Sequence, residues 1–524
     1  YADWPKLYQI LENNTDTSGY NPIIKQIKNA MEKSIPKSQF QLFNNKYPQK
    51  PIWWDQNCEN AIKRRREAFK QFKRVANNEN LLNYNRTAAQ TRRLLKKQKK
   101  GEFRKFCEQL NRDTPISSIW KTIRKFSNSH KPPRHRQEDE QWLQEMLVNI
   151  GESEVEEPPW PETQYRNQED PQPITMEEIS VLLDRKKDST PGIDEINYSI
   201  LKNIPKKHLA GLLTIFNGIL EGTSPIPHEW KNQLILPIIK PGKDPKHHTS
   251  YRPITLTSCV AKTYEGIINN RLEFQMEHKK KFSPLQNGFR KGRSTMNNCI
   301  FLDTQIYKAF SNGEVAVAIF LDISAAYDNV NIHILTNYLN EHNINGKTIQ
   351  SINNMLRNRK VYIRSPNTGT NIGPRYSNKG LMQGSPLSPL LFNIYMADLD
   401  KFNSEHVNIL QFADDILLIS KGKNINLITQ RIEDKLNRIN TWLQNHGLTL
   451  SREKTKAMYF CKRRRTVPRN ITLNNYNIQW VEQYKYLGII FDSHLSWTAH
   501  IDYLTVKASQ GLNVLKSITK VWWG

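Results

Sequence analysis

The clearest pattern in the chain is an unbroken apolar run at residues 315–321, which Asp322 follows immediately. Such a run of residues with high β propensity predicts a strand that is buried on both faces. Residues 409–420 contain two more apolar runs, joined by Asp414 and Asp415. This second pattern predicts a β-hairpin with both carboxylates at its bend.

Between these predicted strands lies a loop followed by an apolar helix. Ser388 followed by Pro389 has the form of a helix N-cap with proline at the first helical position. Gln383 and Gly384 stand just before it, and a glycine there lets the backbone approach a ligand closely. A helix start explains the prolines of this segment but not the Gln-Gly pair.

The first third of the chain divides by charge. Residues 61–110 have helical periodicity and hold 16 lysines and arginines against 4 acidic residues, whereas residues 137–178 hold 13 acidic residues against 1 basic residue. A net charge of 16 − 4 = +12 repels itself unless a polyanion neutralises it. We therefore favour a phosphate-binding arm over a solvated helical face.

Prolines indicate a domain boundary after this arm. They recur at 132–133 and 158–161, which predicts an irregular linker over residues 131–173. Thr175 and Glu178 then form a predicted capping box, and the loop at 190–192 ends that helix. Beyond it, short apolar strands alternate with helical stretches, so an α/β or α+β catalytic body is expected.

Composition narrows the class of protein. The 524 residues include 76 lysines and arginines against 50 acidic residues, so the formal charge of +26 requires an anionic partner. With 37% apolar residues the chain is not a disordered polycation. Five separated cysteines without a C-x-x-C pair indicate reduced thiols. No apolar run could span a membrane and the first residues form no signal peptide, so we expect an intracellular protein.

The three aspartates have a structural and a chemical interpretation. Taken singly, Asp322 could cap the next helix, and an Asp-Asp pair is common at turns. Carboxylates flanked by apolar strands are nevertheless costly unless cations are bound. Together they could hold the two Mg²⁺ ions of a phosphoryl-transfer site, with Mn²⁺ as a substitute. One ion would activate a primer 3′-hydroxyl and the other would stabilise the leaving pyrophosphate.

Three segments, LDISAAYD, GLMQGSPLSPLLFNIY and FADD, closely resemble in order and spacing the A, B and C motifs of reverse transcriptases. Flanking segments agree: SYRPI and NGFR resemble the fingers motifs, LTLSREKTKAM the D motif and YLG the primer grip. The resemblance covers about residues 175–492. PIWWDQNCENAIKRRREAFKQFKR and SSIWKTIRKF further resemble the linker after the endonuclease of jockey-like non-LTR retrotransposon proteins.

The resemblance implies an α+β right-hand polymerase with fingers, a palm built on an antiparallel sheet and a partial thumb. The expected divisions are a basic helical arm at 1–130, the acidic linker at 131–173, fingers at 174–312, palm and primer grip at 313–491, and the start of a thumb at 492–524. Related proteins usually carry an endonuclease, which is not visible in this sequence, so we expect a piece of a longer chain and assign it no target nicking.

The resemblance also implies roles for single residues. Asp322, Asp414 and Asp415 would be catalytic and would ligate the metal ions with the backbone carbonyl of Ile323. Tyr327 would be a steric gate whose ring excludes a ribose 2′-hydroxyl, although core packing is the commoner fate of an isolated tyrosine.

Further expected contacts fall into four groups. Nucleotide binding is expected of Gln383, Gly384, Arg252, Arg290 and Lys240. A general-acid role is a weak expectation for Lys454, which could equally be an ordinary surface lysine. A primer grip is expected at Tyr486, Leu487 and Gly488. Contacts with the nucleic-acid backbone are expected of Arg64, Arg65, Arg66, Arg92, Arg93, Arg463, Arg464 and Arg465, although such clusters could also be a nuclear address.

The function implied by the resemblance is RNA-directed DNA polymerisation. The expected partners are an RNA template, a DNA primer or target, dNTPs and the element RNA as a ribonucleoprotein, without a membrane. The protein would be cytoplasmic in that particle and nuclear at integration. Two rivals stay open: a catalytically decayed RNA-binding protein, and an RNA-dependent RNA polymerase. Tyr327, and Ala413 before the Asp pair, favour deoxynucleotides over the second rival.

Overall fold

The computed structural model describes residues 2–14, 19–35, 51–109, 122, 141–158, 164–366, 368–462 and 469–519, the last six of these by their backbone alone. Contacts divide the chain into two compact units. The larger comprises residues 1–37 and 137–499, and the smaller comprises residues 38–136 and 500–524.

The core of the larger unit is a five-stranded sheet with β3 (Val315–Asp322) at its centre. Side chains of β3 alternate between two cores: Val315, Val317 and Ile319 face one, and Ala316 and Phe320 face the other. The predicted strand buried on both faces is thus confirmed. The strand order is β11 (Gln479–Trp480), β8 (Lys456–Phe460), β3, β7 (Asp415–Gly422) and β6 (Val407–Phe412).

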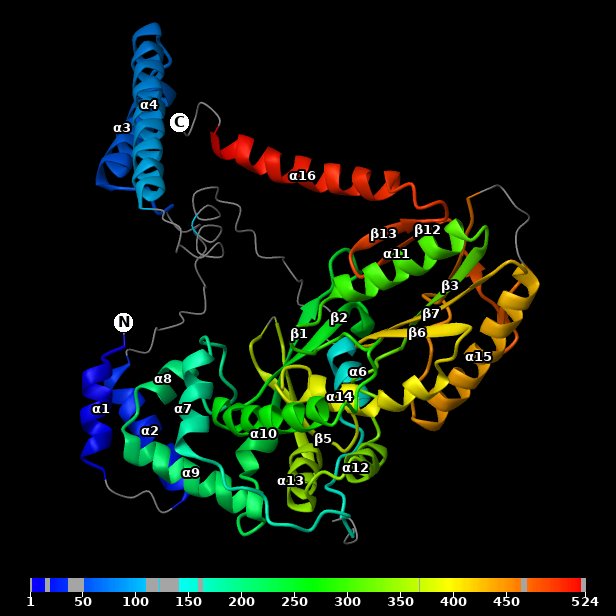
Figure 1. Ribbon diagram of the computed structural model, residues 1–524. Coiled ribbons are helices and arrows are strands. Elements are labelled where there is room, and N and C mark those ends of the chain that lie inside the picture. Colours follow the sequence, from blue (N-terminus) through cyan, green and yellow to red (C-terminus); the bar gives the residue numbers. More distant parts are fainter. Residues whose placement is uncertain are drawn as a thin grey trace. The chain divides into compact units, whose positions relative to one another are not determined.

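Helices cover both faces of this central sheet (Figure 1). On one face lie α11 (Thr295–Ser311) and a hairpin of β12 (Gln483–Tyr486) and β13 (Ile489–Asp492). The other face packs on the helices α12 (Ile332–Glu341), α14 (Ser388–Tyr395) and α15 (Ile425–Asn445) and the short pair β9 (Thr472–Leu473) and β10 (Tyr476–Asn477). Helix α14 begins at Ser388 with Leu387 as its N-cap, one residue earlier than the Ser-Pro pattern predicts.

A second sheet adjoins the first. Its order is β2 (Tyr251–Leu256), β1 (Asn232–Ile239), β4 (Arg359–Arg364) and β5 (Asn371–Ser377). Strands β1 and β4 are parallel, and the outer pairs are antiparallel. The remaining elements of the larger unit are α7 (Met176–Arg185), α8 (Tyr198–Lys202), α9 (Lys206–Glu221), η1 (His228–Lys231), η2 (His248–Ser250), α10 (Cys259–His278), α13 (Gly346–Leu356) and η3 (Ala397–Phe402). Thr175 and Glu178 form the predicted capping box of α7.

Two segments differ from the expected division. Helices α1 (Trp4–Glu12) and α2 (Tyr20–Ser34) belong to the larger unit rather than to the basic arm, because their buried side chains join its main core. Within the expected linker, α6 (Gln141–Ile150) packs on the second sheet through Leu143, Met146 and Leu147. This helix was not predicted, because prolines and acidic residues surround it and its apolar stripe spans only three turns.

The smaller unit contains α3 (Gln56–Arg74) and α4 (Asn78–Glu108), which pack along one another. Thr91 Oγ1 donates to the Ala61 carbonyl across this pair at 3.1 Å, and both helices are otherwise largely exposed. The helical character predicted for residues 61–110 is confirmed, but as two helices interrupted at residues 75–77 and not as one long helix. Most of α16 (Thr498–Thr519) also falls in this unit.

The five cysteines are all free thiols, and four of them are buried. None of the described helices is long and apolar enough to cross a bilayer. The observed architecture is α+β with mainly antiparallel sheets, as expected.

Candidate active site

Strand register brings the aspartates of two distant segments together. Strands β3 and β7 are antiparallel, and Asp322 pairs directly with Asp415. Strands β6 and β7 form the predicted hairpin, with Ala413 at its bend in the left-handed region at φ +58°. Asp322, Asp414 and Asp415 therefore meet at one end of the central sheet, although Asp322 and Asp414 are 92 positions apart along the chain (414 − 322).

The bend is held by the segment that contains the NGFR motif, which was expected to belong to the fingers. Asn287 N donates to the Gln411 carbonyl at 3.0 Å, and Gln411 N donates to the Leu285 carbonyl at 2.9 Å. A Cβ on Gly288 would lie 2.4 Å from Ala413 N, so only glycine fits against the bend. The Asn-Gly step before Phe289 was the signal available in the sequence.

Mutual repulsion shapes the titration of the carboxylates. Burial, and then the charges of Asp414 and Asp322, raise the pKa of Asp415 to about 6. Burial also raises the pKa of Asp414, with Asp322 adding to the shift. Lys454 Nζ lies 2.9 Å from Asp322 Oδ2, so an ammonium already stands beside one carboxylate. The site is short of positive charge.

These donors fit a hard divalent cation by their chemistry. In the part of the chain that the structure describes, no three His, Cys, Asp or Glu side chains converge on one metal position. Asp322 and Asp414 line a common pocket with Ile323, and the charges of Asp415 and Asp322 both act on Tyr484 of the β12–β13 hairpin. Asp415 does not line this pocket, although it pairs with Asp322 across the two strands and its charge interacts with those of Asp322 and Asp414.

This carboxylate pocket has a volume of about 420 Å³ and contains an aromatic wall. Tyr327 stacks on Phe392 with ring centroids 4.9 Å apart and meets the half-exposed Phe289 edge-on at 6.4 Å. Burial raises the pKa of Tyr327, and the charge of Asp414 adds to this. Tyr327 is therefore packed against other aromatic rings, as expected for a core tyrosine, and it also borders the pocket.

The Gln-Gly loop borders the same pocket. Gly384, at φ +138°, would place a Cβ 2.5 Å from the Thr255 carbonyl, so a side chain there has no room. Thr255 N donates to the Gln383 carbonyl at 2.9 Å, and Leu381 N donates to the Tyr327 carbonyl at 2.7 Å. The loop is thus tied to β2 on one side and to the segment after Asp322 on the other.

The expected basic contacts divide into two groups. Burial lowers the pKa of Lys240, followed by the charges of Lys454 and Arg252, while Asp322 raises it; these three cations therefore lie near one another and the site. Arg290 does not fit its expected role. It is almost buried, donates to both oxygens of Glu277 at 2.7 Å and to two backbone carbonyls, and so holds a loop together.

Other predicted contacts are placed as follows. Leu487 and Gly488 form the turn of the β12–β13 hairpin, both with positive φ, but Tyr486 is buried and its hydroxyl accepts from Asn298. Arg64, Arg66, Arg92 and Arg93 are exposed on α3 and α4, and Arg65 is half-buried there. Arg463, Arg464 and Arg465 lie outside the described residues.

Carboxylates at the ends of adjacent antiparallel strands, an aromatic wall and a glycine loop are typical of template-directed nucleotidyltransferases of the right-hand type. In agreement, residues 241–491 match the family model described as reverse transcriptase (RNA-dependent DNA polymerase). This region is therefore similar to reverse transcriptases.

The chain resembles polymerases of insect mobile elements. It is 30% identical over 352 residues to the probable RNA-directed DNA polymerase from transposon BS of Drosophila melanogaster, covering 66% of this chain and 38% of that protein. It is 29% identical over 337 residues to the RNA-directed DNA polymerase from mobile element jockey of the same species, covering 63% and 36%. The chain thus spans well under half of either relative. A solved apo telomerase from Candida tropicalis is similar at 14% identity, with a TM-score of 0.37 over 52% of this chain and 54% of that one.

Asp415→Asn is expected to stabilise the fold by an amount that grows between about pH 4 and pH 6. Because the pKa of Asp415 is raised to about 6 in the folded state, the native protein retains a proton that the unfolded chain loses at about pH 4. The free energy of unfolding of the wild type therefore falls as the pH rises from about 4 to about 6, and this group lowers it no further above that range. Urea unfolding of both proteins from pH 4 to 8 without divalent ions measures this. A stability difference independent of pH would contradict the assignment.

Proposed function

We propose that this chain is the polymerase part of a non-LTR retrotransposon protein and copies RNA into DNA by extending a primer 3′-hydroxyl. The observation that carries the proposal is the cross-strand pairing of Asp322 with Asp415, which places Asp414 at the pocket. Asp322, Asp414 and the Ile323 carbonyl would hold divalent ions with Asp415 beside them. When bound, Mg²⁺ would activate the 3′-hydroxyl and neutralise the leaving pyrophosphate.

The remaining side chains of the pocket would orient the nucleotide. Lys454 lines the pocket, and its charge and that of Arg252 both act on Lys240, so the three cations would together attract a triphosphate. The side chain of Lys454 is 67% exposed, so it could leave Asp322 and donate a proton to pyrophosphate. Tyr327, held by Phe392, would stand where a ribose 2′-hydroxyl would otherwise lie.

Primer extension on an RNA template tests the proposal. The wild-type chain with Mg²⁺ or Mn²⁺ should add deoxynucleotides, and Asp322→Asn should not. No extension by the wild type, with RNA binding intact, would favour a decayed RNA-binding protein. Faster use of ribonucleotides than deoxynucleotides would instead indicate an RNA polymerase. The element RNA as bound partner and residence in nucleus and cytoplasm remain part of this proposal.

RNA binding by the chain should weaken steeply with salt. Each phosphate that a cation neutralises contributes a slope of about −0.7 to the logarithm of affinity against the logarithm of salt for single strands. Changing Arg64, Arg65 and Arg66 on α3 to glutamine should therefore reduce the slope by about 2. A matched variant with the exposed Lys279, Lys280 and Lys281 changed to glutamine removes the same charge and should change it less. Equal slopes for the two variants would refute the arm as a binding surface.

A further inference from the structure

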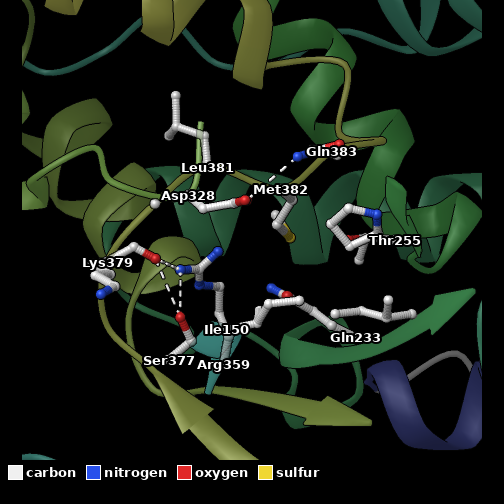
Figure 2. A pocket seen from close by; sticks show the side chains of 13 residues that line it. Ile150, Gln233, Thr255, Asp328, Arg359, Ser377, Lys379, Leu381, Met382 and Gln383 are labelled. Atoms are coloured by element: carbon white, nitrogen blue, oxygen red, sulfur yellow. Dashed lines mark hydrogen bonds between the residues drawn. The ribbon is translucent and has the colours of Figure 1, made fainter. Parts of the chain in front are cut away.

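A small polar cavity shares a wall with the carboxylate pocket. Its volume is about 20 Å³, and its lining includes Gln233, Asp328 and Arg359 (Figure 2). Met382 and Gln383 line both this polar cavity and the carboxylate pocket. Any group that moves the loop of residues 379–384 from the side of the cavity therefore also changes the wall that a nucleotide would meet.

A buried cation, Arg359, lines the polar cavity. Arg359, the first residue of β4, is 3% exposed, and its Nη2 donates to Ser377 Oγ at 3.1 Å and to the Lys379 carbonyl. Its Nε, like Gln233 Nε2, is buried without a hydrogen-bond partner among the described residues. A cavity of this size holds about one water molecule, which could accept from both groups.

Asp328 is the counter-charge inside this cavity. Burial lowers the pKa of Arg359 to about 10, while the charges of Glu152 and Asp328 act in the opposite direction, so the guanidinium stays ionised near neutral pH. Burial raises the pKa of Asp328, and the hydrogen bond from Gln383, followed by the charge of Arg359, lowers it. Both side chains line the same small cavity, so the charge of each favours the ionised form of the other.

Asp328 is connected to the loop of residues 379–384 by a hydrogen bond. Gln383 Nε2 donates to Asp328 Oδ1 at 3.4 Å, as Figure 2 shows, and Gly380 N donates to the Val330 carbonyl at 2.8 Å. An ionised carboxylate only accepts hydrogen bonds, so it binds the amino end of the Gln383 amide and leaves the carbonyl end free to turn elsewhere. The direction of one amide thus depends on the charge of Asp328.

We propose that Arg359 is a positioning residue for nucleotide selection: it fixes Asp328, and through Asp328 the Gln383 amide and the loop that borders the carboxylate pocket. This inference rests on the proposed polymerase function. It assigns a role to Asp328, six residues after Asp322 in the same segment, and to an arginine of the second sheet that no motif of the sequence singled out.

Steady-state primer extension tests this role. Arg359→Met keeps the length of the side chain but removes its charge, and it should raise the KM for dNTPs about tenfold with a smaller change in kcat, because the wall is displaced and not the carboxylates. Arg359→Lys keeps the charge without the planar fork and should recover part of the loss. Arg357→Met is the matched control: Arg357 is 9% exposed, bonds to the Pro158 carbonyl and does not line the cavity. Equal KM values for the two methionine variants would overturn the inference.

Unfolding in urea gives a result that does not require polymerase activity. The double variant Asp328→Asn with Arg359→Met should be more stable than the sum of the two single losses predicts, because each single variant leaves one buried charge unpaired. Simple additivity would overturn the network even if the chain extends primers. Coupling in a chain that extends no primer would support the network while the polymerase proposal failed.

Discussion

Asp414→Asn should abolish primer extension and at the same time make the folded chain more stable. The amide keeps the size of the side chain but removes a charge from the pocket that Asp322 also lines. Loss of one such electrostatic contact to the reacting groups costs about a hundredfold to a thousandfold in rate. Stability should rise because Asp414 is the largest charge that raises the pKa of Asp415.

The two measurements are single-turnover extension and urea unfolding at pH 7 without divalent ions. Asp434→Asn provides the control, since Asp434 is an exposed aspartate of α15 and the change in net charge is the same. The control should leave both quantities unchanged. An Asp414→Asn protein that still extends primers at more than a tenth of the wild-type rate would remove Asp414 from the reaction.

Tyr327→Ala should let the chain incorporate ribonucleotides far better than the wild type does. The tyrosine ring is held against Phe392 at 4.9 Å and borders the carboxylate pocket, so its removal opens space beside the sugar. Rejecting added bulk with an apolar wall is worth roughly 10-fold to 200-fold in discrimination. The ratio of kcat/KM for a deoxynucleotide to that for its ribonucleotide should fall by about this factor.

Tyr327→Phe separates the wall from the hydroxyl. It keeps the ring and its stack on Phe392, so the ratio should remain close to that of the wild type. A fall as large as that of the alanine variant would show that the tyrosine hydroxyl, and not the bulk of the ring, discriminates between the sugars. An unchanged ratio in Tyr327→Ala would place the steric gate elsewhere.

The local pattern of apolar residues was sufficient to predict the strands that carry the carboxylates. The apolar run before Asp322 and the two runs around Asp414 and Asp415 appear as β3, β6 and β7, because a strand buried on both faces must be apolar along its whole length. The capping box at Thr175 was equally local, since its donors and acceptors lie within one turn.

The roles of single arginines were much harder to predict from the sequence. Arg290 lies in a fingers-like motif, yet its guanidinium is committed to Glu277, thirteen residues earlier, by an ion pair that no local pattern announces. Arg359 belongs to no motif, and its importance depends on β4 lying beside the loop that carries Gln383. A charged side chain can reach several ångströms in any direction, so its partner is chosen by the packing of distant segments.

The amino-acid sequence alone determined the class of this chain: three motifs in order, each with its strand, turn or helix, and a positive charge that requires a polyanion. Tertiary structure decided which aspartates share a pocket, which arginines remain available and which small helices join the core. The reason is physical. Strand and turn formation depend on neighbours within a few residues, whereas a site depends on the register between strands and on burial, which arise only when the whole chain packs.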